Sequence, residues 1–241
     1  MSRPARSRLP WQLVVTCEHA SAAIPKSLGD LGLPARVLRS HRAFDVGALP
    51  IAQSLAKTLR APWFVGRWSR LVADLNRSDA HPRVIAARVD GRLVPGNQLD
   101  AAALAQRLAR YWRPWREQVE RRITALVARG PVLHVAVHSF VERLGGVERK
   151  NDIGLLCDPA RRREVAFCRQ LQQSLAASGL RVRRNFPYFG DTDGFTTHLR
   201  QRLPVARYVG IEIECNQRRV RTAAGQHAVA AALHALGHLA E

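Results

Sequence analysis

Three polar residues interrupt apolar runs that have the composition of buried strands. His19 follows QLVVTC, His138 ends the run LHVAVH, and Glu212 lies inside YVGIEI. Catalytic zinc sites use three histidine or carboxylate ligands and leave one position open for water. A carboxylate in an apolar strand must pair, bind a metal or act as a base, because an unpaired buried charge is costly. These residues predict a metal-assisted acid–base site at strand ends.

Each of these residues also has an ordinary structural interpretation. A single histidine after a strand is more often a hydrogen-bonded structural residue, and the chain has no HxxH or HExxH pair. Glu212 could instead form an ion pair with one of the many arginines. Ser139 follows His138 without a GxSxG elbow, so it is expected to orient other groups and not to act as a nucleophile.

The segment 69–77, SRLVADLNR, carries a second set of chemical groups. The planar fork of Arg77 can bind a carboxylate through two parallel hydrogen bonds, and Asn76 supplies a neutral donor beside it. Arg70 is placed to stabilise the oxyanion that forms when water attacks an amide carbonyl. Asp74 is expected to orient these groups. Because arginine is so common in this chain, these assignments depend on the motif and not on the residue type.

The elements that must position these groups alternate between strand and helix patterns, without an internal repeat. This order predicts an α/β sandwich. The expected strands cover residues 12–17, 132–138, 152–157, 181–184 and 206–214, with an extended stretch over 62–74. The expected helices cover residues 46–60, 99–129, 159–178 and 222–240. Residues 78–98 contain Pro and Gly and are expected to form a long loop that carries substrate contacts.

Length and composition predict one catalytic domain over residues 11–241, preceded by a flexible basic segment over residues 1–10. A chain of 241 residues with 46% hydrophobic and 24% charged residues can fill a single α/β domain. The N-terminal segment lacks the apolar core of a signal peptide, and no later run of about 18 apolar residues could cross a bilayer. A cytoplasmic protein is therefore expected. The four cysteines form no CxxC pair and are expected to be reduced, buried thiols.

The formal net charge of +19 is the strongest indication against an enzyme and for a nucleic-acid-binding protein, because nucleic-acid binders are typically very basic. However, the basic residues are spread along the whole chain. No helix-turn-helix, RNP or GXXG signature accompanies them. Specific nucleic-acid binding is therefore not expected.

Several short segments occur in the order typical of one known family. They are CEHASAAIP, SHRAFDVGALPIAQSLA, WSRLVADLNRS, VPGNQLD, AVHSF, NDIGLLCD, NFPYFGDTDGFTTH and VGIEIE. Together they span nearly the whole chain, and through them it resembles the N-formylglutamate amidohydrolase family. The resemblance implies a zinc-carboxypeptidase-like three-layer α/β/α sandwich with a mixed central sheet, shared with aspartoacylase and succinylglutamate desuccinylase.

The resemblance also implies one zinc ion per chain, with His19 and His138 as ligands. Related acylases take a further ligand from a Glu three residues after the first His, but Ala22 stands there in this chain. Asp45, in the segment HRAFDVGA, is predicted to replace it.

Two alternatives to Asp45 as a ligand remain open, Glu18 and His41. Glu18 adjoins His19, and neighbouring residues in an extended turn point apart. Asp45 could instead cap the helix that follows it.

The implied reaction is zinc-dependent cleavage of the amide of a small N-acyl amino acid similar to N-formyl-L-glutamate, giving the free amino acid and formate. Glu212 would take the proton of water and deliver it to the leaving amine, while Arg70 stabilises the oxyanion. The segment that follows Glu212 departs from the best-known members, which leaves other N-acyl amino acids open as substrates. The expected substrate-binding residues are Asn76, Arg77, Ser139, Tyr188 and His198.

The expected partner is this small-molecule substrate, with no membrane, and the oligomeric state is not indicated. The alternative is a basic protein that binds polyanions or nucleic acid on a degenerate hydrolase scaffold. Intact His19, His138, Arg70 and Glu212 argue against degeneration, whereas the lack of a second ligand would favour that alternative.

Overall fold

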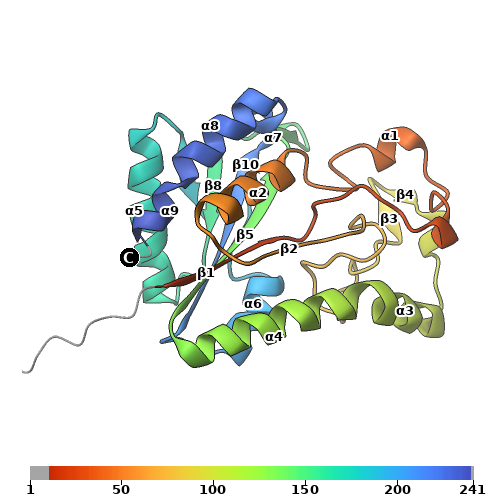
Figure 1. Ribbon diagram of the computed structural model, residues 1–241. Coiled ribbons are helices and arrows are strands. Elements are labelled where there is room, and N and C mark those ends of the chain that lie inside the picture. Colours follow the sequence, from red (N-terminus) through yellow and green to blue (C-terminus); the bar gives the residue numbers. More distant parts are fainter. Residues whose placement is uncertain (1–10, 240–241) are drawn as a thin grey trace, which may run out of the picture.

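The computed structural model describes residues 11–239 and builds them around a six-stranded sheet (Figure 1). The expected basic segment over residues 1–10 lies outside the described residues. The strand order is β2-β1-β5-β10-β8-β9. The strands are β1 (Gln12–Cys17), β2 (Trp63–Val65), β5 (Val132–Phe140), β8 (Ile153–Leu156), β9 (Val182–Arg184) and β10 (Tyr208–Asn216).

The sheet is mixed, and its three longest strands run in the same direction. β1 pairs in parallel with β2 and β5, and β5 pairs in parallel with β10, whereas β8 is antiparallel to β10. The register places Glu214 beside His138 and Glu212 beside Ala136. Because parallel strands end at the same edge of a sheet, the polar ends of β1, β5 and β10 are brought together.

Helices cover both faces of the sheet and complete three layers (Figure 1). The strands are buried on both sides, which explains why β5 and β10 are nearly continuous apolar runs. The expected three-layer α/β/α sandwich with a mixed central sheet is confirmed. One face packs against α2 (Ala48–Thr58), α5 (Arg162–Ala177), α8 (Ala223–Leu233) and α9 (Ala235–Leu239). The other packs against α4 (Arg113–Arg129) and α6 (Phe195–Arg202).

Smaller elements gather beyond the carboxyl end of β1, at the right of Figure 1. Among them are α1 (Ala35–Leu38), the hairpin of β3 (Arg88–Val89) and β4 (Arg92–Leu93), and α3 (Ala101–Arg107). The remaining short elements are the 3-10 turns Lys26–Leu28 and Pro95–Asn97, the hairpin of β6 (Arg143–Leu144) and β7 (Val147–Glu148), and α7 (Gln217–Val220). The expected long loop over residues 78–98 therefore contains a short hairpin.

The helix expected over residues 99–129 is present but carries a π-helical turn, Leu108–Trp112, between α3 and α4. Its start is capped by Asp100, whose side chain accepts a hydrogen bond from the Ala103 amide. Pro114 lacks an N–H group and cannot continue regular helical bonding to Arg110, which explains the wider turn. None of the described helices combines the length and apolar composition required to cross a membrane.

Three expected elements differ in the structure. The stretch 62–74 is not extended throughout, because β2 ends at Val65 and buried turns follow. The segment 185–198, which holds the expected substrate contacts Tyr188 and His198 and no expected helix, becomes helical at Phe195, whose ring is completely buried against α4. The closing helix is interrupted at His234, between α8 and α9.

Candidate metal centre and substrate cleft

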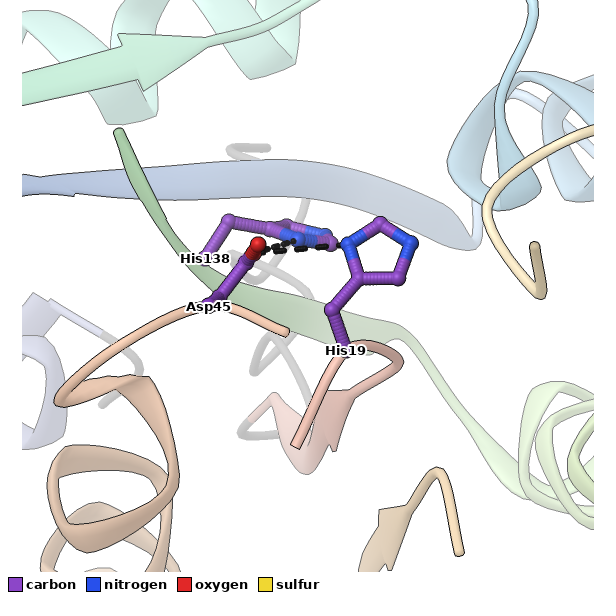
Figure 2. A group of neighbouring side chains, drawn as sticks. All are labelled: His19, Asp45 and His138. Atoms are coloured by element: carbon purple, nitrogen blue, oxygen red, sulfur yellow. Dashed lines mark hydrogen bonds and ion pairs between the residues drawn. The ribbon is translucent and has the colours of Figure 1, made fainter. Parts of the chain in front are cut away.

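Two histidines and one aspartate from separate segments converge at the polar edge of the sheet (Figure 2). His19 follows β1, His138 lies near the end of β5, and Asp45 precedes α2. The Asp45 Oδ2 atom lies 3.4 Å from His19 Nδ1 and 2.9 Å from His138 Nδ1. All three side chains are buried. We call this group the His–Asp–His cluster.

The donor set and spacing of the His–Asp–His cluster fit a small divalent cation. Zinc–ligand bonds to histidine nitrogen and carboxylate oxygen are about 2.0–2.1 Å, which places tetrahedral ligand atoms about 3.3 Å apart. The two Nδ1-to-Oδ2 separations, 3.4 and 2.9 Å, are close to that value. The cluster offers three candidate ligand atoms, the number of protein ligands typical of catalytic zinc sites.

The outer nitrogen of each histidine faces a second carboxylate. His19 Nε2 lies 2.7 Å from Asp74 Oδ1, and Asp74 Oδ2 accepts a 2.7 Å hydrogen bond from Arg70 Nη2. His138 Nε2 lies 3.2 Å from Glu18 Oε2. Carboxylates at this position orient metal-binding imidazoles and make them more basic. This arrangement leaves both Nδ1 atoms directed at Asp45.

Several buried polar atoms at the site have no hydrogen-bond partner among the described residues. They include both carboxylate oxygens of Glu18, Nε2 of His138 and one carboxylate oxygen of Glu214. The 3.2 Å approach of Glu18 to His138 is a close charge contact without hydrogen-bond alignment. Buried polar atoms without partners are costly. Their concentration here indicates a site built for a ligand and not only for packing.

The carboxylates and imidazoles of the site shift one another's pKa values. Burial alone would raise the pKa of Glu18, but the proximity of His138 outweighs it and lowers the pKa to about 2. Burial alone would lower the pKa of His138, but Asp45 and Glu18 raise that pKa well above its usual value. Positive charge at the site is therefore stabilised by the surrounding carboxylates. Protons on the imidazoles and a divalent metal would compete to supply it.

Glu212 lies beside the His–Asp–His cluster, on β10. Its Oε2 is 4.0 Å from His138 Nε2 and accepts a 3.4 Å hydrogen bond from Asn76 Nδ2. Its Oε1 accepts a 2.6 Å hydrogen bond from the hydroxyl of Thr196, which is completely buried. Both carboxylate oxygens are thus held by neutral donors, which fix the side chain without neutralising it.

A cavity of about 360 Å³, which we call the cleft, opens above the His–Asp–His cluster. Nine of the ten residues predicted for the site line the cleft: His19, Asp45, Arg70, Asn76, Arg77, His138, Ser139, Tyr188 and Glu212. The cleft is also lined by His41, Arg42, Arg83, Asp90 and Glu214.

His198 is the predicted substrate contact that the structure does not bring into the cleft. It belongs to α6, which directs its ring toward α4, where Nε2 lies 2.9 Å from Glu120 Oε2. The ring also stacks on Phe195. The expected role is corrected accordingly, because the helical turn after Gly194 was not anticipated.

The alternatives for the third ligand take other positions. Glu18 lies on the outer side of His138, and His41 lines the cleft without joining the His–Asp–His cluster. Asp45 does not cap the following helix, because the N-cap position belongs to Gly47 in a left-handed conformation with φ 81°. The Asp45 carboxylate instead accepts a hydrogen bond from the Ser139 amide.

The side chains predicted to bind substrate differ in how many of their hydrogen-bonding groups are already engaged within the protein. Asn76 is already engaged, since its Oδ1 accepts from the Phe195 amide and its Nδ2 donates to Glu212. The Ser139 hydroxyl donates to the Val46 carbonyl. Arg77 donates only to the backbone carbonyl of Asp193 and has no carboxylate partner among the described residues. Arg77 therefore keeps donors for a ligand, whereas Asn76 is placed to position Glu212.

Three residues of the site were missed from the sequence: Glu214, Thr196 and Arg83. Glu214 is two residues after Glu212 on the same face of β10, so strand periodicity could have identified it. Burial raises the pKa of Glu214 to about 8. No helix or strand periodicity singles out Thr196 or Arg83, and only the fold brings them to the site.

The mixed α/β/α sandwich and the buried His–Asp–His cluster define an α/β protein with a candidate metal centre at the polar edge of its sheet. The model of the N-formylglutamate amidohydrolase family matches residues 11–220, and the chain belongs to this family. No curated protein sequence matches the chain.

Two solved structures are similar over almost the whole chain. A gene product from Agrobacterium tumefaciens shares 34% identity with a TM-score of 0.85, over 95% of this chain and 90% of that one. The N-formylglutamate amidohydrolase from Ralstonia eutropha JMP134 shares 18% identity with a TM-score of 0.74, over 98% of this chain and 95% of that one. The second likeness supports the fold.

Proposed function

We propose that this protein is a zinc-dependent amidohydrolase that cleaves small N-acyl amino acids, with N-formyl-L-glutamate as the leading candidate. The observation that carries the proposal is the convergence of two Nδ1 atoms on Asp45, beside the restrained carboxylate of Glu212. Membership of the N-formylglutamate amidohydrolase family supports the same reaction. The products would be the free amino acid and formate.

His19, Asp45 and His138 would hold the metal, which when bound supplies a Lewis acid that activates water and polarises the carbonyl. Glu212 acts as the base that removes the proton from the attacking water, and it returns that proton to the amine nitrogen as the C–N bond breaks. Thr196 and Asn76 hold Glu212 for both transfers. No covalent intermediate with the protein is required.

Arg70 is suited to stabilise the negative oxygen that develops during attack. It lines the cleft, and its side chain is 28% exposed. Two of its donors are used by Asp74, at 2.7 and 3.2 Å, and a third approaches Asp45 at 3.5 Å. Because a guanidinium has five N–H groups, donors remain for the substrate.

Two cations of the cleft support an acidic substrate. Arg77 and Arg83 both line the cleft and have no carboxylate partner among the described residues. Arg42, by contrast, is paired with Asp90. Free arginines bind carboxylates strongly and with defined geometry. A dicarboxylate such as N-formyl-L-glutamate would engage both.

The first test is the metal content of the purified, nucleic-acid-free protein, together with its hydrolysis of N-formyl-L-glutamate. We expect about one zinc per chain in the wild type and none in His138→Ala, since losing one of three ligands destroys the site. His198→Ala is the matched control, because His198 lies outside the cleft, and it should keep both zinc and turnover. A wild-type protein that takes up no metal on reconstitution would refute the proposal.

A further inference from the structure

A second cavity, of about 330 Å³, shares no lining residue with the cleft. It lies between the segment that follows β2 and the π-helical turn that leads into α4. Ala73 and Leu75 contribute to its lining. We call it the aromatic cavity, because three of its lining residues are Trp68, Tyr111 and Trp115.

Trp68 and Tyr111 form a corner of two rings in the aromatic cavity. Their centroids are 6.2 Å apart and their planes are nearly perpendicular, at 86°. Both side chains are only partly buried. Aromatic faces of this kind bind flat rings by stacking, with about 1–3 kcal/mol per base in nucleic-acid complexes. The corner therefore suits a planar ligand.

Two arginines place positive charge directly over this corner. The guanidinium of Arg67 lies 4.7 Å from the Trp68 ring centroid, and that of Arg110 lies 5.5 Å from the Tyr111 centroid. Both arginines are exposed, and neither has an ion-pair partner among the described residues. Unpaired guanidinium groups are good partners for phosphate, which they bind through two parallel hydrogen bonds.

The amide of Gln118 completes the set of recognition groups. It lines the cavity, is exposed, and makes no hydrogen bond to any described residue. A free side-chain amide offers both donors and an acceptor, which is what the edge of a nucleobase requires. Two stacking surfaces, two arginines without ion-pair partners and a free amide thus lie around one cavity.

We propose that the aromatic cavity binds a nucleoside monophosphate, with its base against Trp68 and Tyr111 and its phosphate between Arg67 and Arg110. A volume of about 330 Å³ is near the lower limit for small-molecule sites, which favours one nucleotide over a longer chain. A nucleotide within a nucleic-acid strand has the same chemistry. The test therefore includes both forms.

The test is isothermal titration of the full-length, nucleic-acid-free protein with adenosine monophosphate at low salt. Arg67→Glu and Arg110→Glu should each weaken binding by about tenfold or more, and adenosine should bind at least about tenfold more weakly than its monophosphate. Arg169→Glu is the matched control, because Arg169 is exposed on α5 and changes the net charge equally. It should leave binding unchanged.

Four outcomes would overturn the proposal. They are no binding at millimolar adenosine monophosphate, equal binding of adenosine, equal loss in Arg169→Glu and in the cavity variants, and much tighter binding of single-stranded oligoadenylate that depends on Arg67. The third would indicate unspecific attraction to a basic chain. The fourth would make a nucleic-acid strand the occupant. Melting temperatures of the variants would establish that each one is folded.

Discussion

Asp74 contacts the ring of His19 on the side opposite to Asp45. Its Oδ1 lies 2.7 Å from Nε2, whereas Nδ1 of the same ring lies 3.4 Å from Asp45 Oδ2. Arg70 donates to the other oxygen of Asp74 from both Nε and Nη2. The ring of His19 is thus aimed by a carboxylate that is itself held in place.

We expect Asp74→Asn to weaken zinc binding by about 10–100-fold, because the amide orients His19 less strongly and makes it less basic. Competition with a chelating dye would measure the change. Asp79→Asn is the control, since Asp79 is exposed in the same segment and forms no ion pair among the described residues. Unchanged zinc affinity in Asp74→Asn would show that Asp74 does not support the metal.

Thr196 should influence turnover through Glu212 and not through substrate binding. In Thr196→Val the 2.6 Å hydrogen bond to Glu212 Oε1 is lost, and we expect kcat to fall by about tenfold or more with KM nearly unchanged. Thr196→Ser keeps the hydroxyl and should recover most of the activity. Zinc content should be normal in both variants. A change confined to KM would contradict the positioning role.

Arg77 and Arg83 should recognise different carboxylates of the substrate. Arg77 is the more buried and follows Asn76, which donates a hydrogen bond to Glu212, so we assign Arg77 the α-carboxylate. Arg83 is exposed and would hold the side-chain carboxylate. Losing one charged hydrogen bond of about 1.5–3 kcal/mol lowers kcat/KM by about 10–100-fold.

N-formyl-L-glutamine provides the discriminating comparison, because it has the size of N-formyl-L-glutamate without the second charge. Arg77→Ala should impair hydrolysis of both compounds. Arg83→Ala should impair hydrolysis of N-formyl-L-glutamate alone. If Arg83→Ala reduced kcat/KM equally for both, the second carboxylate would have to bind elsewhere.

His134 should make the folded protein sensitive to acid. It is completely buried and hydrogen-bonded to Thr16 and Tyr208, both at 2.8 Å. Burial lowers its pKa to about 4, below the value of about 6.5 in an unfolded chain. Between these values the unfolded chain binds a proton that the folded protein does not. The free energy of unfolding should therefore fall as the pH falls, by up to about 3 kcal/mol.

His134→Gln removes this titration, so its stability should depend less on pH. Urea unfolding of both proteins at pH 7 and pH 5 would measure the difference. The variant should be less stable at pH 7, because buried hydrogen bonds change, but it should lose less on acidification. Parallel losses in the two proteins would show that His134 is not responsible.

The sequence predicted the central strands well, and physical reasons explain where it was less successful. β1, β5 and β10 are buried on both faces, so their apolar runs are long and unambiguous. The helix α6 follows a segment rich in Gly and Asp, and its two buried apolar residues, Phe195 and Leu199, give too short a pattern.

The residues of the site likewise divide into those that the sequence pattern predicts and those that it does not. His19, His138 and Glu212 are visible in the sequence because each interrupts an apolar strand pattern. Asp45 required the resemblance to a family. The contact between Thr196 and Glu212 could not be predicted, since it depends on how α6 packs against β10.

The buried floor of the cleft is acidic, although the chain as a whole carries a net charge of +19. The buried acidic residues that line it are Asp45, Asp74, Glu212 and Glu214. Such a separation of charge orients a substrate before it makes contact, because the positive exterior attracts its carboxylates and the acidic interior repels them. The uncharged amide is then the end that enters first. The association rate of the substrate should be high in dilute buffer and should fall as salt is added. A substrate molecule that approaches with its carboxylates first should be repelled by the acidic floor.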